Sequence, residues 1–254
     1  MNSKTLSSSA MSIIDQYINF TVGGAVCSIP YFNNKTVNLR HALRTYIGKG
    51  SPREIRDEIT SILVKNHVSI ETLIPESLKK LIVDNKIGID CSALAYYILN
   101  AESESNGKGS LKKHISFINR RGFFGKIRAK LRPVENCDVS TLADDKNSSV
   151  VNLKEIAPGD MIAMIGGPDN NDRDHILVVH RVDYQDSVPQ NSKPVAIYYT
   201  HAVAYPEDGL YGTGVRQGKI ELTNASKNIL EAQWSENQML ERAKKSKMEI
   251  RRVV

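Results

Sequence analysis

The spacing of apolar residues changes partway along the chain, and this change strongly limits the folds that the sequence can adopt. The first ninety residues show helical spacing. Ser51, followed by Pro52 and Glu54, is typical of a capping box with proline in the first turn. The apolar residues that follow recur every three or four positions, which predicts a helix with one buried face. A further helix is predicted over residues 76–83.

The second half of the chain shows the spacing of strands instead. Runs rich in Val, Ile and Tyr are bounded by clusters of Pro, Gly, Asn and Asp. The predicted strands cover residues 161–166, 175–184, 194–204 and 219–222, with 249–254 as a final one. Helices followed by strands that turns connect predict an α+β fold with an antiparallel sheet, and they argue against alternating βαβ units.

Composition narrows the class of protein further. The chain has 254 residues, of which 41% are hydrophobic and 24% charged, and this balance excludes a disordered or fibrous protein. No apolar stretch approaches the length of about 18 residues that a membrane-spanning helix needs. The N-terminus also lacks the apolar core of a signal peptide. We therefore expect a soluble protein that is either cytoplasmic or exported by a non-classical or specialised route.

Cys91 is the first residue that could carry chemistry. Asp90 is predicted to cap the helix that follows, which places the Cys91 thiol in the first turn, where the positive end of the helix dipole favours the thiolate. A buried structural cysteine is the alternative. Cys27 and Cys137 lack such a setting. Because three cysteines cannot all pair, at least one thiol is free.

Two histidines could act with this thiol as a base and as an orienting partner. His175 opens a predicted strand and His201 lies late in the next, so antiparallel pairing would bring them close together. His180 lies at an odd offset from His175 and is predicted to be structural. The sequence shows neither metal-ligand spacing nor a phosphate-binding glycine loop, so we expect no cofactor and no metal.

Several short segments, in the same chain order, resemble the NlpC-type cysteine peptidases, a papain-fold family of cell-wall endopeptidases and amidases. The nucleophile motif of that family is similar to DCSALAYYIL (90–99), and its Pro-Gly-Asp turn is similar to IAPGDMIAM (156–164). The strands that carry its histidine base and its third polar residue are similar to DHILVVHRV (174–182) and YTHAV (199–203). Its Pro-Tyr segment is similar to SIPYFNN (28–34).

This resemblance implies roles for four residues of the chain. They are Cys91 as nucleophile, His175 as general base, His201 as the residue that orients the base, and Tyr31 as a contributor to the oxyanion site. Ala93 stands where the family usually has glycine. Sixty positions separate Tyr31 from Cys91, a longer gap than is usual in the family.

The same resemblance implies a papain-like fold in which the nucleophile helix packs on the antiparallel sheet. Residues 1–86 would form an N-terminal helical region that includes the Pro-Tyr segment. Residues 87–254 would form a catalytic core with a basic insertion at 101–150, all within one compact domain. The implied activity is a cysteine hydrolase that cleaves an amide or peptide bond through a thioester, with bacterial peptidoglycan peptides as the expected substrate. Two alternatives stay open: an acyltransferase or transglutaminase-like enzyme with the same triad, and a non-catalytic binding module that uses the basic insertion to recruit an anionic partner.

The net charge of the chain is concentrated in the basic insertion. The formal net charge is +6, and between residues 101 and 135 nine Lys and Arg residues, Arg120 and Arg121 among them, stand against three Glu residues. Phe117, Phe123 and Phe124 lie among these cations, a mixture that suits an anionic membrane surface or a phosphate-bearing polymer. Nucleic acid is the weakest of these partners, because no nucleic-acid motif is present. The alternative is a solvated loop or an amphipathic helix whose apolar side packs onto the domain.

Overall fold

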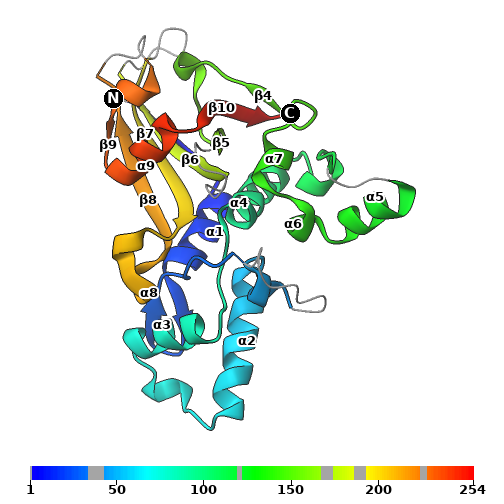
Figure 1. Cartoon of the computed structure of the whole chain (residues 1–254), viewed down its shortest axis with the longest axis vertical. Helices are drawn as coiled ribbons and strands as arrows, with labels where there is room; N and C mark the ends of the chain where they lie inside the picture. Colours follow the sequence, from blue (N-terminus) through cyan, green and yellow to red (C-terminus); the bar gives the residue numbers. More distant parts are fainter. Residues whose placement is uncertain (1, 34–42, 119–121, 167–173, 186–192, 224–227) are drawn as a thin grey trace.

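The protein is an α+β structure built around one large antiparallel sheet, as the sequence predicts (Figure 1). The computed structural model describes residues 2–33, 43–118, 122–166, 174–185, 193–223 and 228–254. Within these residues, no helix is both long enough and apolar enough to cross a membrane. A small hairpin of β2 (Phe20–Val22) and β3 (Ala25–Cys27) stands apart from the main sheet.

The main sheet has eight strands among the described residues, and every neighbouring pair is antiparallel. Its order is β4-β10-β5-β6-β7-β8-β9, with β1 paired to β6 beside this path. The strands are β1 (Asn2–Thr5), β4 (Ser148–Val150), β5 (Met161–Ile165), β6 (His175–Tyr184), β7 (Pro194–Val203), β8 (Gly214–Glu221), β9 (Gln233–Trp234) and β10 (Lys247–Val253).

The predicted strands are confirmed, but the prediction of helices alone in the first ninety residues is wrong. β1 pairs with the second half of β6, from Thr5↔Arg181 to Asn2↔Tyr184, while β5 pairs with the first half. All four residues of β1 are exposed, so the strand has no alternation of apolar residues that would reveal it in the sequence. Consequently, the N-terminus and the second half of the chain share one sheet.

The helices lie around the sheet and between its connections. They are α1 (Ser8–Ile18), α2 (Pro52–Lys65), α3 (Pro75–Asp84), α4 (Cys91–Ser105), α5 (Gly122–Leu131), α6 (Pro133–Asn136), α7 (Val139–Leu142), α8 (Gly209–Gly212) and α9 (Asn237–Lys244). The capping box before α2 is confirmed, since Ser51 Oγ accepts the Glu54 N–H at 3.2 Å and Glu54 Oε2 accepts the Ser51 N–H at 2.8 Å.

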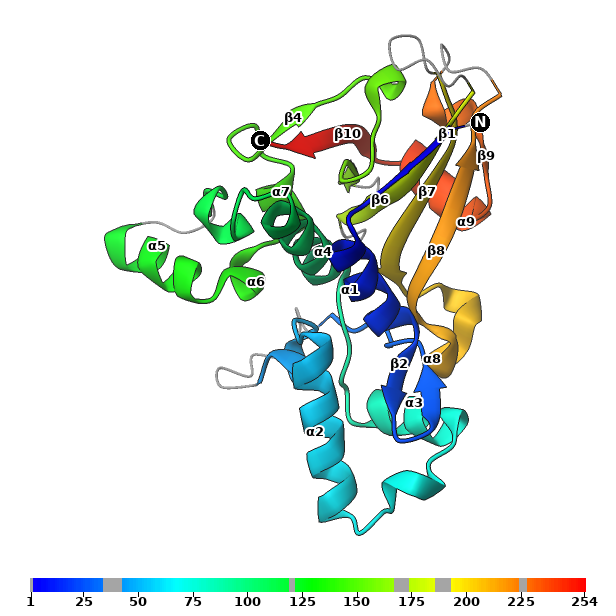
Figure 2. The same ribbon diagram turned by 180° about the vertical axis from the view of Figure 1, so that it is seen from behind.

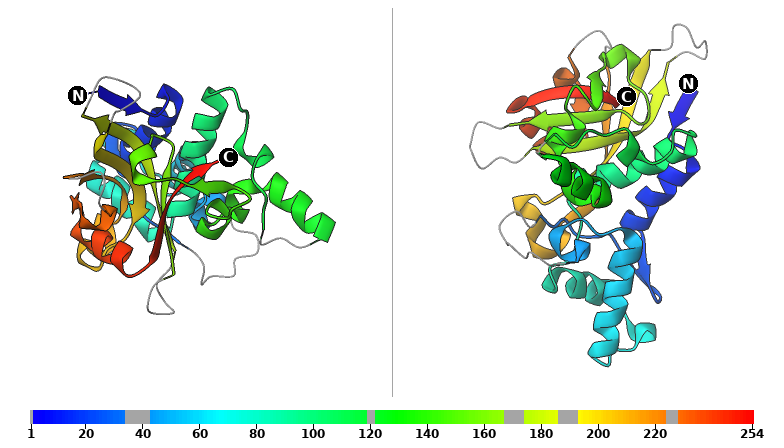
Figure 3. Two further views of the ribbon diagram at one scale, coloured as in Figure 1. Left: turned by 90° about the horizontal axis from the view of Figure 1, so that it is seen from above. Right: turned by 90° about the vertical axis from the view of Figure 1, so that its right-hand side faces the viewer.

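Both faces of the sheet are buried, each against its own core. In β6, Ile176 belongs to the core that includes α1 and α4, whereas Leu177 belongs to the core that includes Met239 of α9. Figures 2 and 3 show α1 and α4 on one side of the strands and α9 on the other. Helix α4 is thereby held against β6 and β7, the strands that contain His175 and His201.

Candidate functional site

Cys91 is the first residue of α4, and Asp90 fixes the start of this helix as predicted. Asp90 Oδ1 accepts the Ala93 N–H at 2.8 Å, which satisfies one of the free amide groups at the helix start. The carbonyl of Gly48 accepts the Asp90 N–H at 2.9 Å. These two contacts hold the first turn, so the Cys91 thiol, in a residue that is 5% exposed, leaves the helix in a defined direction.

A buried cation that the sequence analysis missed lies behind the first turn of α4. Lys49 Nζ lies 2.8 Å from Asp90 Oδ2 and donates a hydrogen bond to Ser92 Oγ at 2.8 Å. Burial by itself lowers the pKa of Lys49, but the Asp90 carboxylate raises the pKa above its ordinary value. Lys49 is therefore charged, and the pair anchors the loop before α2 to the start of α4.

The pKa of the Cys91 thiol is raised to about 12, which corrects the expectation of a resting thiolate. Burial is the largest cause, and the Asp90 carboxylate adds to it. Lys49, the Ile176 backbone N–H and Arg242 act in the opposite direction but do not outweigh burial. The helix dipole is thus not sufficient here, because an ionised sulfur loses its hydration in this site. In the resting protein Cys91 is a neutral thiol.

The structure brings His175 and His201 together, as the strand order predicts. His175 Nε2 lies 3.0 Å from His201 Nδ1, and the two rings meet edge to face with an interplanar angle of 81°. Both residues are buried. The pairing of β6 with β7 ends at Val178↔Thr200, and both histidines lie just beyond this last β6–β7 pair.

Cys91 lies near the start of β6. The backbone N–H of Ile176, the residue after His175, is close enough to the Cys91 sulfur to lower the pKa of the thiol. Cys91 belongs to the core on the α4 side of the sheet, whereas the His201 ring packs on Tyr199, which belongs to the core on the α9 side. Cys91 therefore lies on the α4 side of the sheet, whereas the His201 ring lies on the α9 side.

A carboxylate that the sequence analysis also missed extends this row of side chains. Glu236 Oε2 lies 2.9 Å from His201 Nε2, an ion-pair contact that is not aligned as a hydrogen bond. Tyr199 donates to the same oxygen at 2.8 Å, and Tyr205 donates to the other oxygen at 3.3 Å. Burial opposes ionisation of Glu236, but the contacts with His201 and Tyr199 lower its pKa below the ordinary value.

These contacts favour one pair of tautomers for the two histidines. An ionised Glu236 only accepts hydrogen bonds, so a proton on His201 Nε2 would face the carboxylate and leave Nδ1 to accept from His175. His175 then donates through Nε2, which leaves Nδ1 as its basic nitrogen. Burial, then His201 and Arg242, hold the pKa of His175 well below its usual range, so the ring is neutral at neutral pH.

Tyr31 lies beside the start of α4 despite the long gap in sequence. It forms a parallel bridge with Ile89, two residues before Cys91. Tyr31 also lines an open pocket of about 760 Å³ together with Tyr205. Tyr205 also donates a hydrogen bond to Glu236, but Cys91, His175 and His201 do not line this pocket. Tyr31 is thus close to the start of α4 through its bridge with Ile89.

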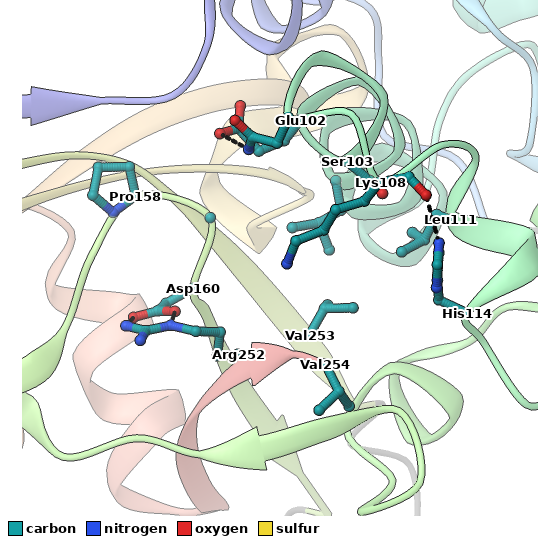
Figure 4. Close-up of a pocket in the computed structure, with 13 residues that line it drawn as sticks. Glu102, Ser103, Lys108, Leu111, His114, Pro158, Asp160, Arg252, Val253 and Val254 are labelled. Atoms are coloured by element: carbon teal, nitrogen blue, oxygen red, sulfur yellow. Dashed lines mark hydrogen bonds and ion pairs between the residues drawn. The ribbon is translucent and has the colours of Figure 1, made fainter.

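The Pro-Gly-Asp turn holds the sheet together at a different place. Asp160 is fully buried and forms an ion pair with Arg252 at 2.6 and 2.8 Å, which Figure 4 shows at one side of a pocket. Asp160 also accepts the Ala157 N–H at 2.8 Å. The pocket is smaller, about 160 Å³, and Lys108 and His114 line its other side. This pocket is not lined by the histidine pair or by the thiol.

The remaining cysteines resemble Cys91 in that burial raises the pKa of their thiols. All three cysteines are free thiols, and burial raises the pKa of Cys27 to about 11 and that of Cys137 to about 12. Among the residues that the structure describes, no group of three or more His, Cys, Asp and Glu side chains could hold a metal ion.

Comparisons of the chain with protein-family models, with curated proteins and with solved structures find no match.

Proposed function

We propose that the protein is a cysteine hydrolase that cleaves an amide bond, with a papain-like arrangement of the NlpC type. The observations that carry this proposal are the row Glu236–His201–His175 and the position of Cys91 in the first turn of a buried helix, near the start of the strand that holds His175. Both nitrogens of His201 face a neighbour in the row but only Nε2 of His175 does, so His175 Nδ1 would be the base of the row. An orienting carboxylate behind an imidazole serves the same purpose in serine and cysteine hydrolases on unrelated folds.

In the proposed reaction, His175 Nδ1 takes the thiol proton as the Cys91 sulfur attacks the amide carbonyl. Proton transfer and attack occur together, because both groups are neutral in the resting site. The positive charge on His175 is then stabilised through His201 by Glu236. His175 delivers the proton to the amine as the C–N bond breaks, and a thioester forms on Cys91. Water hydrolyses the thioester, with His175 again as the base.

The oxyanion of the tetrahedral intermediate needs hydrogen-bond donors near the start of α4. The Cys91 backbone N–H lies in the first turn, where amide groups have no partner within the helix. The Tyr31 hydroxyl is the proposed second donor, supported by the Tyr31–Ile89 bridge that places this residue next to the helix start. One such donor contributes about 3 kcal/mol of transition-state stabilisation.

The substrate class follows from the pocket and from the resemblance of the motifs. The pocket beside Tyr31 and Tyr205 is lined largely by apolar side chains, with Asp84 and Lys86 among its polar ones. A peptide chain with both apolar and charged groups suits such a lining. We therefore propose peptides of bacterial peptidoglycan as the substrate.

The experiment is product analysis after incubation with purified peptidoglycan and its soluble cross-linked peptides. Mass spectrometry should detect a new free amine and a new carboxylate with the wild type. Cys91→Ala and His175→Ala should abolish both products. Cys137→Ala is the matched control, because this cysteine is also buried and has its pKa raised for the same main reason. Cleavage by Cys91→Ala at the wild-type rate would eliminate the proposal.

The same experiment separates the alternatives. If the enzyme transfers the acyl group to amines, added glycinamide should become joined to the product. If it is a hydrolase, the product should carry only the free carboxylate that water forms. A non-catalytic binding module predicts that Cys91→Ala retains peptidoglycan binding and that the wild type releases no product.

A further inference from the structure

Helix α5 (Gly122–Leu131) stands out from the body of the protein, as Figures 1 and 2 show from opposite sides. Its described contacts with other elements are mainly with the short helix α6 (Pro133–Asn136). Ala129 is the one buried residue of the helix, so a single position faces the rest of the protein. Arg120 and Arg121, which the sequence analysis includes in the basic insertion, lie outside the described residues.

The apolar side chains of α5 face solvent, which makes the alternative of packing onto the domain wrong. Phe123 and Phe124 are 73% and 84% exposed, and their rings contact each other edge to face. Ile127 is 41% exposed and Leu131 73% exposed. At about 100° per residue, these four side chains occupy an arc of roughly 100° on the side opposite Ala129. They form an outward-facing apolar ridge, here called the α5 ridge.

Cations lie on both sides of the α5 ridge. The same spacing places Lys126 and Lys130 along one edge of the ridge and Arg128 along the other. All three are exposed, and α5 contains no acidic residue. Long basic side chains at the edges of an apolar face can bury their stems against acyl chains while the charges reach the headgroups.

We propose that α5 is a docking helix for an anionic membrane surface, with the α5 ridge inserted at the boundary between headgroups and acyl chains. This arrangement suits the flat surface of an anionic membrane: the apolar residues lie at the centre of the contact, and the cations lie on both sides of them, where they can reach the headgroups. A nucleic-acid site would instead place cations at the centre of the contact, where the phosphates lie. The inference is independent of the proposed peptidase chemistry, because no residue of the site is involved.

Binding to vesicles of phosphatidylglycerol and phosphatidylcholine in a 3:7 ratio tests this proposal, with pure phosphatidylcholine as the comparison. The wild type should float with the anionic vesicles and not with the neutral ones. In a Phe124→Trp variant, the fluorescence emission of the added tryptophan should shift to shorter wavelength on binding, and brominated lipid chains should quench it. The native Trp234 is buried and gives a constant background.

Variants separate the apolar and the electrostatic contributions. Phe123→Ser with Phe124→Ser should lower the partition coefficient at least about tenfold. Removal of one cation should lower the partition coefficient about fivefold. Lys126→Glu with Lys130→Glu should therefore lower the partition coefficient more than about 25-fold, and it should also reduce the salt dependence of binding. The matched control is Val64→Ser with Lys65→Glu, an exposed apolar and basic pair on α2. It should bind vesicles as the wild type does, and so should Cys91→Ala.

Three results would overturn the proposal. The first is equal binding to neutral and anionic vesicles or no binding to either. The second is tighter binding to single-stranded or duplex DNA than to anionic vesicles at the same salt concentration. The third is a concentration-dependent dimer of the wild type that Phe123→Ser with Phe124→Ser disperses, because the α5 ridge would then be an interface between two copies of the chain.

Discussion

Replacing Lys49 with methionine tests the buried ion pair at the start of α4. Methionine matches the length of the lysine stem but removes the cation that contacts both Asp90 oxygens, at 2.8 and 3.1 Å. The two side chains are only 12% and 8% exposed. Water therefore cannot replace the lost partner, and the Asp90 carboxylate stays buried without a counter-charge.

The expected loss in the free energy of unfolding is large for a single substitution. Removing one partner of a buried ion pair costs about 3–5 kcal/mol. Asp90→Asn should cost less than this, because asparagine can still accept the Ala93 N–H and cap α4. In the double variant, two neutral side chains face each other, so its loss should be about 2 kcal/mol smaller than the sum of the single losses.

Urea unfolding followed by the fluorescence of Trp234, the one tryptophan of the chain, measures these losses. Trp234 is buried and donates to the Ile229 carbonyl at 3.1 Å, so its emission should report the loss of the sheet. Lys65→Met on the exposed face of α2 is the control and should stay within about 0.5 kcal/mol of the wild type. A loss below about 1 kcal/mol for Lys49→Met, or strictly additive losses in the double variant, would refute this reasoning.

Three further predictions concern the site and its support. Glu236→Gln should lower kcat/KM for amide cleavage about tenfold or more and leave folding unchanged, because the neutral amide no longer fixes the tautomer of His201; wild-type kinetics would exclude this role. Burial, then Arg181, lowers the pKa of His180 to about 4, so the unfolded chain takes up a proton that the folded chain refuses between pH 6.5 and about 4. Stability should fall by about 3 kcal/mol over this window, and His180→Asn should flatten the acid limb of the unfolding curve. Gly48→Ala should destabilise the protein by about 2 kcal/mol or more in the same assay, since Gly48 has φ 72° and a Cβ would collide with the Phe32 carbonyl.

The parts of the site that local sequence determines could be predicted. Asp90 and Cys91 follow from a capping signal at a helix start, and the His175–His201 contact follows from two adjacent strands with short-range signals. The residues that could not be predicted reach the site from distant segments. Lys49 lies before α2 and Glu236 before α9, and neither stands at a spacing that links it to the cysteine or the histidines.

The protonation state of Cys91 could not be predicted either, because it is a property of the packed protein. The helix dipole is readable in the sequence, but the burial that opposes it depends on how α4 meets β6 and the loop at Lys49. In the same way, the exposure of the α5 ridge depends on which surfaces the rest of the chain covers. The sequence marks its aromatic and basic residues but not the direction in which they face.

The formation of a thioester on Cys91 is the most direct test of the proposed chemistry. Turnover of a soluble peptidoglycan peptide is quenched in acid within milliseconds to seconds, and the protein is mapped by mass spectrometry. We expect an acyl adduct on Cys91 alone, absent from His175→Ala and released by neutral hydroxylamine. Amide cleavage that continues in Cys91→Ala, or an acyl adduct on Cys27 or Cys137 in place of Cys91, would contradict the account.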